Sequence, residues 1–131
     1  QGLSMSGNFK SPIGNRGIET VLMPSYTFLN NKTSHFEGVI SNYQLQYLKH
    51  KAALLAQIIY QNKWTLAPGY RFEQRMSNSS FHILDLSLSY QHAKGQIYID
   101  MNNLTNVKQV DAYALPLVGR WMSIGFKLDL R

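Results

Sequence analysis

Short stretches in which apolar and polar residues alternate recur along the whole chain. A period of two residues is typical of β-strands, because successive side chains of a strand point to opposite faces of the sheet. Near the C-terminus, for example, Met122, Ile124 and Phe126 alternate with polar or small residues. The period predicts strands over about 3–10, 17–29, 47–60, 63–73, 81–91, 95–103 and 120–130. We therefore expect an all-β chain with six or seven antiparallel, up-and-down strands.

The connections between these predicted strands differ in length in a regular order. Short turns alternate along the chain with longer loops: the turns are expected near 11–16, 61–62 and 92–94, and the loops near 30–46, 74–80 and 104–119. Outer-membrane barrels have short turns at one end and longer loops at the other. The order therefore favours a large transmembrane β-barrel, of which this chain would form roughly a third.

Two segments fit the strand pattern less simply. Residues 52–59 are apolar on both faces, and Ala52, Leu55 and Ile59 also share the spacing of a helix, so a short buried helix is an alternative to a strand there. Pro68 lies inside another predicted strand, where it removes one hydrogen-bond donor from the ladder. At Pro68 we expect a β-bulge or an edge strand.

Alternation does not tell which face of the sheet lies inside. A small soluble β-barrel that binds a lipid or another apolar ligand has the same alternation with its apolar face inward, and a surface-adhesion or carbohydrate-binding sandwich is a third alternative. Tyr60, Trp64 and Tyr90 fall beside the predicted short turns. A membrane barrel places aromatic residues at that depth, which favours the transmembrane interpretation.

Composition limits the classes of protein further. The chain of 131 residues has no run of about 18 apolar residues, which excludes a transmembrane helix, whereas a transmembrane strand needs only about 10 residues of alternating character. The formal net charge of +6 comes from residues spread along the chain, so we expect a solvated surface and no nucleic-acid partner. The chain has no cysteine, which excludes disulfides and thiolate metal sites.

The sequence contains no motif for catalysis. Its histidines lack the spacing of metal ligands, and neither a nucleophile elbow nor a phosphate-binding glycine loop is present. We therefore expect no enzyme, cofactor or metal. On the polar face, Tyr98 and Trp121 could stack against a ligand or fill space between strands. Asp85 and Asp100, on adjacent strands, could form a pair or a cation site, or be two solvated carboxylates.

The tail of the chain carries an ordered set of motifs. A predicted strand ends on the sequence Asn-Leu-Thr-Asn, a loop over 107–118 follows, and Gly-Arg precedes a last strand over 121–130. In this order the tail resembles the C-terminal end of the barrel in TonB-dependent outer-membrane receptors. Val118 stands where that family often has proline, and Leu130 where an aromatic residue is usual. The residues that carry the resemblance are Asn103, Leu104, Thr105, Asn106, Gly119 and Arg120.

The resemblance implies that residues 1–131 are the C-terminal portion of a receptor barrel in the bacterial outer membrane, with the plug domain and the rest of the barrel absent. It implies active import of a scarce nutrient such as a ferric siderophore, cobalamin or haem. An energy-coupling protein would contact the absent N-terminal part, and outer-membrane lipid would surround the barrel. Tyr98 and Asp100 are the expected ligand-binding residues in the lumen. The isolated fragment would have open strand edges, so we expect it to oligomerise.

Overall fold

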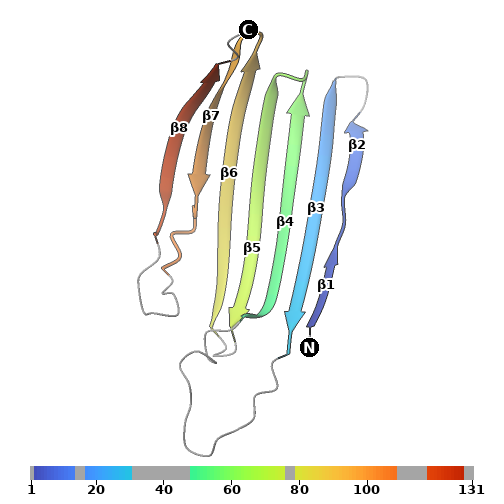
Figure 1. The fold of residues 1–131 in the computed structure, drawn as a ribbon, viewed down its shortest axis with the longest axis vertical. Helices are drawn as coiled ribbons and strands as arrows, with labels where there is room; N and C mark the ends of the chain where they lie inside the picture. The colour runs from blue at the N-terminus through green and yellow to red at the C-terminus, as the bar shows by residue number, and fades with distance from the viewer. Residues whose placement is uncertain (1, 14–16, 31–47, 76–78, 109–117, 129–131) are drawn as a thin grey trace, which may run out of the picture.

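One antiparallel sheet contains all the regular structure of the described residues. The computed structural model describes residues 2–13, 17–30, 48–75, 79–108 and 118–128. Its eight strands lie in the order β1-β3-β4-β5-β6-β7-β8, with β2 also beside β3 (Figure 1). The strands are β1 (Gly2–Ser6), β2 (Phe9–Ile13), β3 (Ile18–Leu29), β4 (Leu48–Tyr60), β5 (Trp64–Arg75), β6 (Ser80–His92), β7 (Gly95–Asn102) and β8 (Trp121–Leu128). The predicted all-β, antiparallel, up-and-down fold is confirmed.

The first predicted strand, 3–10, is in fact two strands, β1 and β2. Both pair with β3 in one register, and they are separated at Gly7 and Asn8. The amide of Gly7 donates to the carbonyl of Pro24 at 3.0 Å. Because proline has no N–H, Pro24 cannot return the second hydrogen bond of this pair. The ladder is therefore interrupted at that point.

Residues 52–59 form a strand and not a helix. They lie in β4, between β3 and β5, and so are covered by neighbouring strands along both edges. The expected bulge or edge at Pro68 is wrong: β5 is an interior strand, and its pairing with β4 stops after Leu55 with Gly69 and resumes at Ile58 with Leu66 in the same register. Proline lacks one N–H donor, so pairing is lost only beside Pro68 on the side of β5 that faces β4. On the other side, Pro68 still pairs with Leu86 of β6.

The two short turns that the structure describes, β4–β5 and β6–β7, lie where the sequence predicts them. In the β4–β5 turn Gln61 and Asn62 have φ angles of 50° and 54°, as a type I′ hairpin turn requires. This turn and the short β6–β7 turn lie at one end of the sheet, and β3, β5 and β7 end at the other, which we call the long-loop end (Figure 1). The loop predicted over 74–80 is shorter, because β5 continues to Arg75. The turn predicted over 11–16 begins too early, because β2 continues to Ile13. Parts of the connections predicted over 11–16, 30–46 and 104–119 lie outside the described residues.

The registers align the alternating residues into two faces. On what we call the polar face lie the charged residues of the paired strands: Lys10, Glu19, Lys51, Arg71, Glu73, Arg75, Asp85, Asp100 and Lys127. The opposite side, the apolar face, carries no Asp, Glu, Lys or Arg within the described registers. Lys49 lies at the register shift between Leu48 and His50.

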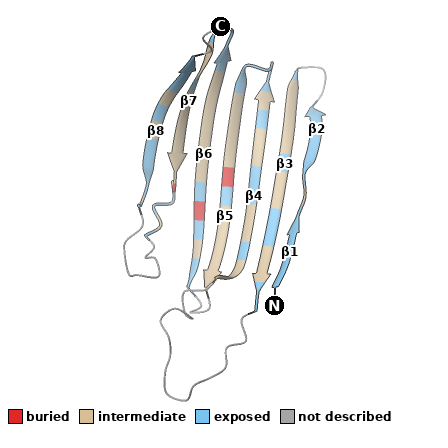
Figure 2. Cartoon of the chain, viewed as in Figure 1, coloured by how far each residue is buried: buried red, intermediate tan, exposed pale blue. Residues whose placement is uncertain are grey.

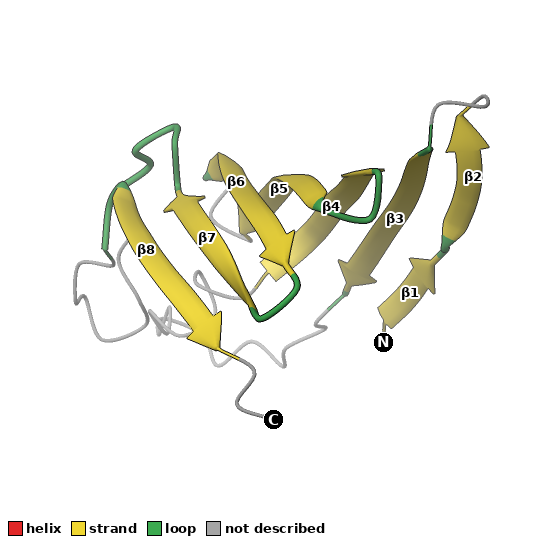
Figure 3. Cartoon of the chain, turned by 90° about the horizontal axis from the view of Figure 1, so that it is seen from above, coloured by secondary structure: helices red, strands yellow, loops and turns green. Residues whose placement is uncertain are grey.

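No second layer covers either face of this sheet among the described residues. Ile83 is the one buried hydrophobic residue among them, and large apolar side chains such as Ile124 and Phe126 are 68% and 73% exposed (Figure 2). The sheet is curved and open (Figure 3). Exposed apolar surface of this extent is typical of a surface that contacts a membrane or another protein.

Candidate functional site

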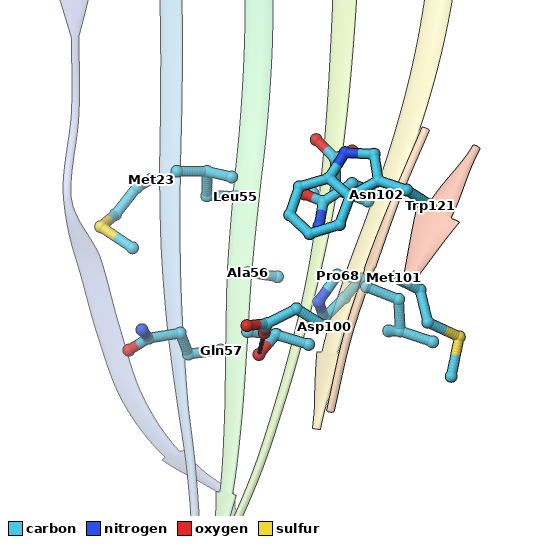
Figure 4. Close-up of a pocket in the computed structure, with 14 residues that line it drawn as sticks. Met23, Leu55, Ala56, Gln57, Pro68, Asp100, Met101, Asn102 and Trp121 are labelled. Atoms are coloured by element: carbon cyan, nitrogen blue, oxygen red, sulfur yellow. Dashed lines mark hydrogen bonds between the residues drawn. The ribbon is translucent and has the colours of Figure 1, made fainter. Parts of the chain in front are cut away.

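A hollow of about 340 Å³ lies on the polar face of the curved sheet. Side chains and backbone from β3 to β8 line it, including Met23, Leu55, Gln57, Asp100, Asn102 and Trp121 (Figure 4). Strands at opposite sides of the sheet can border one hollow only where the sheet bends around it. The polar face is therefore the concave face, and the apolar face is convex.

Asp85 joins three strands at one side of this hollow. Its Oδ2 accepts hydrogen bonds from Nε of Arg71 at 3.1 Å and from Nη2 at 3.0 Å. Its Oδ1 accepts the backbone N–H of Asn103 at 2.8 Å. Charge-assisted bonds of this kind are stronger than neutral ones. Asp85 thus fixes β5 against β6 and holds the end of β7 in place.

Asp100 has a different partner from Asp85. The hydroxyl of Ser87, directly across on β6, donates to Oδ1 of Asp100 at 2.5 Å. Both carboxylates line the hollow, and each is held by its own neighbour. Among the described residues there is no group of three or more His, Cys, Asp or Glu side chains that could hold a metal ion.

The structure places the two predicted ligand-binding residues in different surroundings. Asp100 and Trp121 both border the hollow, where they could contact a small ligand. Tyr98 lies across from Gly125, and a Cβ at Gly125 would collide with atoms of the Tyr98 ring. The ring therefore covers the glycine backbone of β8. Ligand binding by Tyr98 and Asp100 stays a prediction.

Asn103 folds the chain sharply at the end of β7. It has a positive φ of 53°, a conformation that asparagine adopts more easily than most residues, and it is 9% exposed. Its side chain accepts the N–H of Val107 at 2.9 Å and donates to the carbonyl of Val107 at 2.9 Å. It also accepts the hydroxyl of Thr105 at 3.3 Å. The side chain of Asn103 thus closes the turn from inside.

The rest of the motif ties this turn to its neighbours. The N–H of Leu104 donates to the carbonyl of Leu84 at 2.7 Å, which anchors the turn on β6. Oδ1 of Asn106 accepts the N–H of Arg120 at 3.1 Å, which anchors the start of β8. A Cβ at Gly119 would lie 2.8 Å from that same Oδ1, so the close approach favours glycine. The motif residues build the rim that joins β6, β7 and β8.

The apolar face has aromatic side chains at both ends. At the short-turn end, Tyr60, Trp64 and Tyr90 pair directly across β4, β5 and β6, and the rings of Trp64 and Tyr90 are 4.5 Å apart. This row contains the three aromatic residues that the sequence places beside the short turns. The opposite end has Tyr26, Phe28, Tyr70 and Phe72, which the sequence analysis did not single out.

The distance between the two aromatic ends matches a membrane. Along β4, the segment from His50 to Tyr60 rises about 33 Å at about 3.3 Å per residue. With a strand tilt of about 40°, as in outer-membrane barrels, it would span about 25 Å, the height of their apolar band.

Comparisons of the chain with protein-family models, with curated proteins and with solved structures found no match in any of the three. The resemblance of the tail to TonB-dependent receptors therefore stays a prediction. In the part of the chain that the structure describes, no helix is long and apolar enough to cross a membrane.

Proposed function

We propose that this chain is part of the β-barrel of a TonB-dependent receptor in the bacterial outer membrane, which imports a scarce nutrient such as a ferric siderophore, cobalamin or haem. The observation that carries the proposal is the convex apolar face, which has no charged residue in the described registers and no covering layer. A charged side chain at the middle of a bilayer costs about 2–4 kcal/mol, so a lipid-facing surface excludes such residues.

The direction of curvature distinguishes this proposal from a small soluble barrel. A soluble barrel that binds an apolar ligand must bend toward its apolar face, so that this face lines the interior. Here the hollow that spans β3 to β8 lies on the polar face, with Gln57, Asp85 and Asp100 among its lining residues. The hollow beside Ile97 and Phe126 on the apolar face involves only β6 to β8. Continuing the same curvature would place the polar face in a lumen and the apolar face in lipid.

The choice of a nutrient receptor rests on the tail. Asn103 to Asn106, together with Gly119 and Arg120, resemble the family in sequence and order, and their contacts give the motif a structural role at the long-loop rim. In this proposal the ligand passes along the polar face, where Asp100 and Trp121 border the hollow. Energy would come through a coupling protein that contacts another part of the receptor.

Cell fractionation tests this proposal. An antibody raised against the chain is expected to label a heat-modifiable outer-membrane band several times larger than the 15.0 kDa of these 131 residues. Heat modification is expected because a folded barrel migrates differently from its unfolded chain. An antibody against a cytoplasmic enzyme controls the purity of the membrane fraction. A soluble band near 15 kDa would rule the receptor out and favour the soluble barrel.

A further inference from the structure

Two clusters of the same composition and geometry lie on the apolar face at the long-loop end. In the first, the hydroxyl of Tyr26 is 2.7 Å from Nδ1 of His50, and the ring of Phe28 is 5.0 Å from the histidine ring. In the second, the hydroxyl of Tyr70 is 2.7 Å from Nδ1 of His82. The ring centroids of tyrosine and histidine are 6.1 Å apart in both clusters.

The two clusters share a sequence motif and the same pairing between their two strands. Residues 24–28 read Pro-Ser-Tyr-Thr-Phe, and residues 68–72 read Pro-Gly-Tyr-Arg-Phe. In each hairpin the phenylalanine pairs with the histidine, and the proline pairs with a leucine four residues after that histidine. The β3–β4 and β5–β6 pairs thus build the same cluster twice, two strands or about 10 Å apart. The second cluster is shifted by two residues along the register, because Gln74 pairs with His50 and Phe72 pairs with Ala52.

Each histidine has one ring nitrogen outside the tyrosine bond. When the tyrosine O–H donates to Nδ1, the imidazole is neutral and carries its proton on Nε2. In an imidazolium, Nδ1–H would instead donate to the tyrosine oxygen, and Nε2 would again carry a proton. Nε2 is then a donor on a face that has no Asp or Glu in the described registers. Among the described residues no hydrogen bond involves Nε2 of either histidine, so this N–H can donate to an acceptor from outside the sheet.

The depth of the clusters favours a lipid phosphate as the acceptor. The charged residues of the paired strands at this end, Lys51, Arg71, Glu73 and Arg75, lie on the opposite, polar face. The clusters themselves lie at the edge of the apolar band, the depth at which lipid headgroups meet a membrane protein. Lipid phosphates supply oxygen acceptors and negative charge at that depth.

We propose that the Tyr26–His50 and Tyr70–His82 pairs are two equivalent binding sites for the phosphate groups of membrane lipids. Each tyrosine orients its histidine, and Nε2 of the histidine donates to a phosphate oxygen. This inference rests on the proposed membrane location of the apolar face, and it adds a specific ligand chemistry at the long-loop rim.

The test compares histidine resonances of the ¹⁵N-labelled chain in micelles of dodecylphosphocholine, which carries a phosphate, and of dodecylmaltoside, which does not. The Nε2 protons of His50 and His82 are expected to shift downfield in dodecylphosphocholine alone. His92 is the control, because it lies on the same face at the other end and none of its described contacts is a hydrogen bond to tyrosine. Tyr26→Phe should abolish the shift at His50 alone, and Tyr70→Phe the shift at His82 alone.

Three results would overturn the inference. Equal resonances in both detergents would show that no phosphate binds, and equal shifts at His92 would show a general effect of the detergent. A shift produced by inorganic phosphate in dodecylmaltoside would assign the sites to the free ion. A doxyl-labelled fatty acid in the same micelles separates the two proposals: if it broadens the methyl signals of Leu86 and Leu88 while the histidines do not respond, only the phosphate sites fail.

Discussion

An arginine in place of Leu86 is expected to lower the free energy of unfolding of the lipid-embedded chain by about 2–4 kcal/mol. Leu86 pairs with Pro68 and Met101 on the apolar face, and along β6 it lies midway between His82 and Tyr90 at the two ends. An arginine there would enter the middle of the hydrocarbon layer without a partner. Denaturant unfolding of the chain in phospholipid vesicles measures the loss.

Two arginine variants provide matched controls for Leu86→Arg. Ile97→Arg introduces the same charge on the same face but in the row of Tyr90, at the membrane edge, where the cost falls to about 0–1 kcal/mol. Ser89→Arg introduces it on the polar face, and we expect a change within about 0.5 kcal/mol. If Ile97→Arg destabilised the chain as much as Leu86→Arg, the apolar face would not lie across a bilayer.

Replacing Asp85 with alanine is expected to lower the free energy of unfolding by about 2 kcal/mol, because two partners lose their acceptor at once. The N–H of Asn103 would be left unpaired, and Arg71 would lose its carboxylate. The side chains of Arg71 and Asp85 are 38% and 25% exposed, and water therefore reduces the value of the ion pair. Denaturant unfolding measures the change in the same vesicles.

Asp85→Asn separates the two contributions. It keeps an oxygen for the N–H of Asn103 and removes the charge that Arg71 contacts, so about 1 kcal/mol of the loss should remain. Glu19→Ala, which removes the more exposed ion pair with Lys10, should cost less than about 1 kcal/mol. Equal losses for the alanine and asparagine variants of Asp85 would mean that the bond to Asn103 contributes nothing.

The sequence predicted the strands well because a sheet with two different faces imposes a period of two on every strand. Residues 52–59 follow that rule only weakly, yet their neighbours on both sides make them a strand. The split of the first predicted strand was not predictable from its own residues. It depends on Pro24, a residue of the strand beside it.

The candidate site was predictable only in part. The spacing of Asp85 and Asp100 placed both carboxylates on one face, but their partners Arg71 and Ser87 depend on registers that alternation does not give. The Tyr26–His50 contact joins residues 24 positions apart, so it also depends on a register that alternation does not give. The repeat of Pro-x-Tyr-x-Phe was the one local signal for these clusters. The curvature of the sheet decides which face is concave, and a sequence period of two residues gives no information about this curvature.

A cysteine scan along β6 tests most directly the claim that the apolar face contacts lipid. The chain has no native cysteine, so single spin labels can be attached at each position from 84 to 89. In lipid vesicles we predict that labels at Leu84, Leu86 and Leu88 are accessible to oxygen, which concentrates in hydrocarbon. Labels at the three intervening positions should instead be accessible to a water-soluble nickel chelate. If the labels at the three leucines were shielded from both reagents, the apolar face would lie in a protein core. That result would contradict the account.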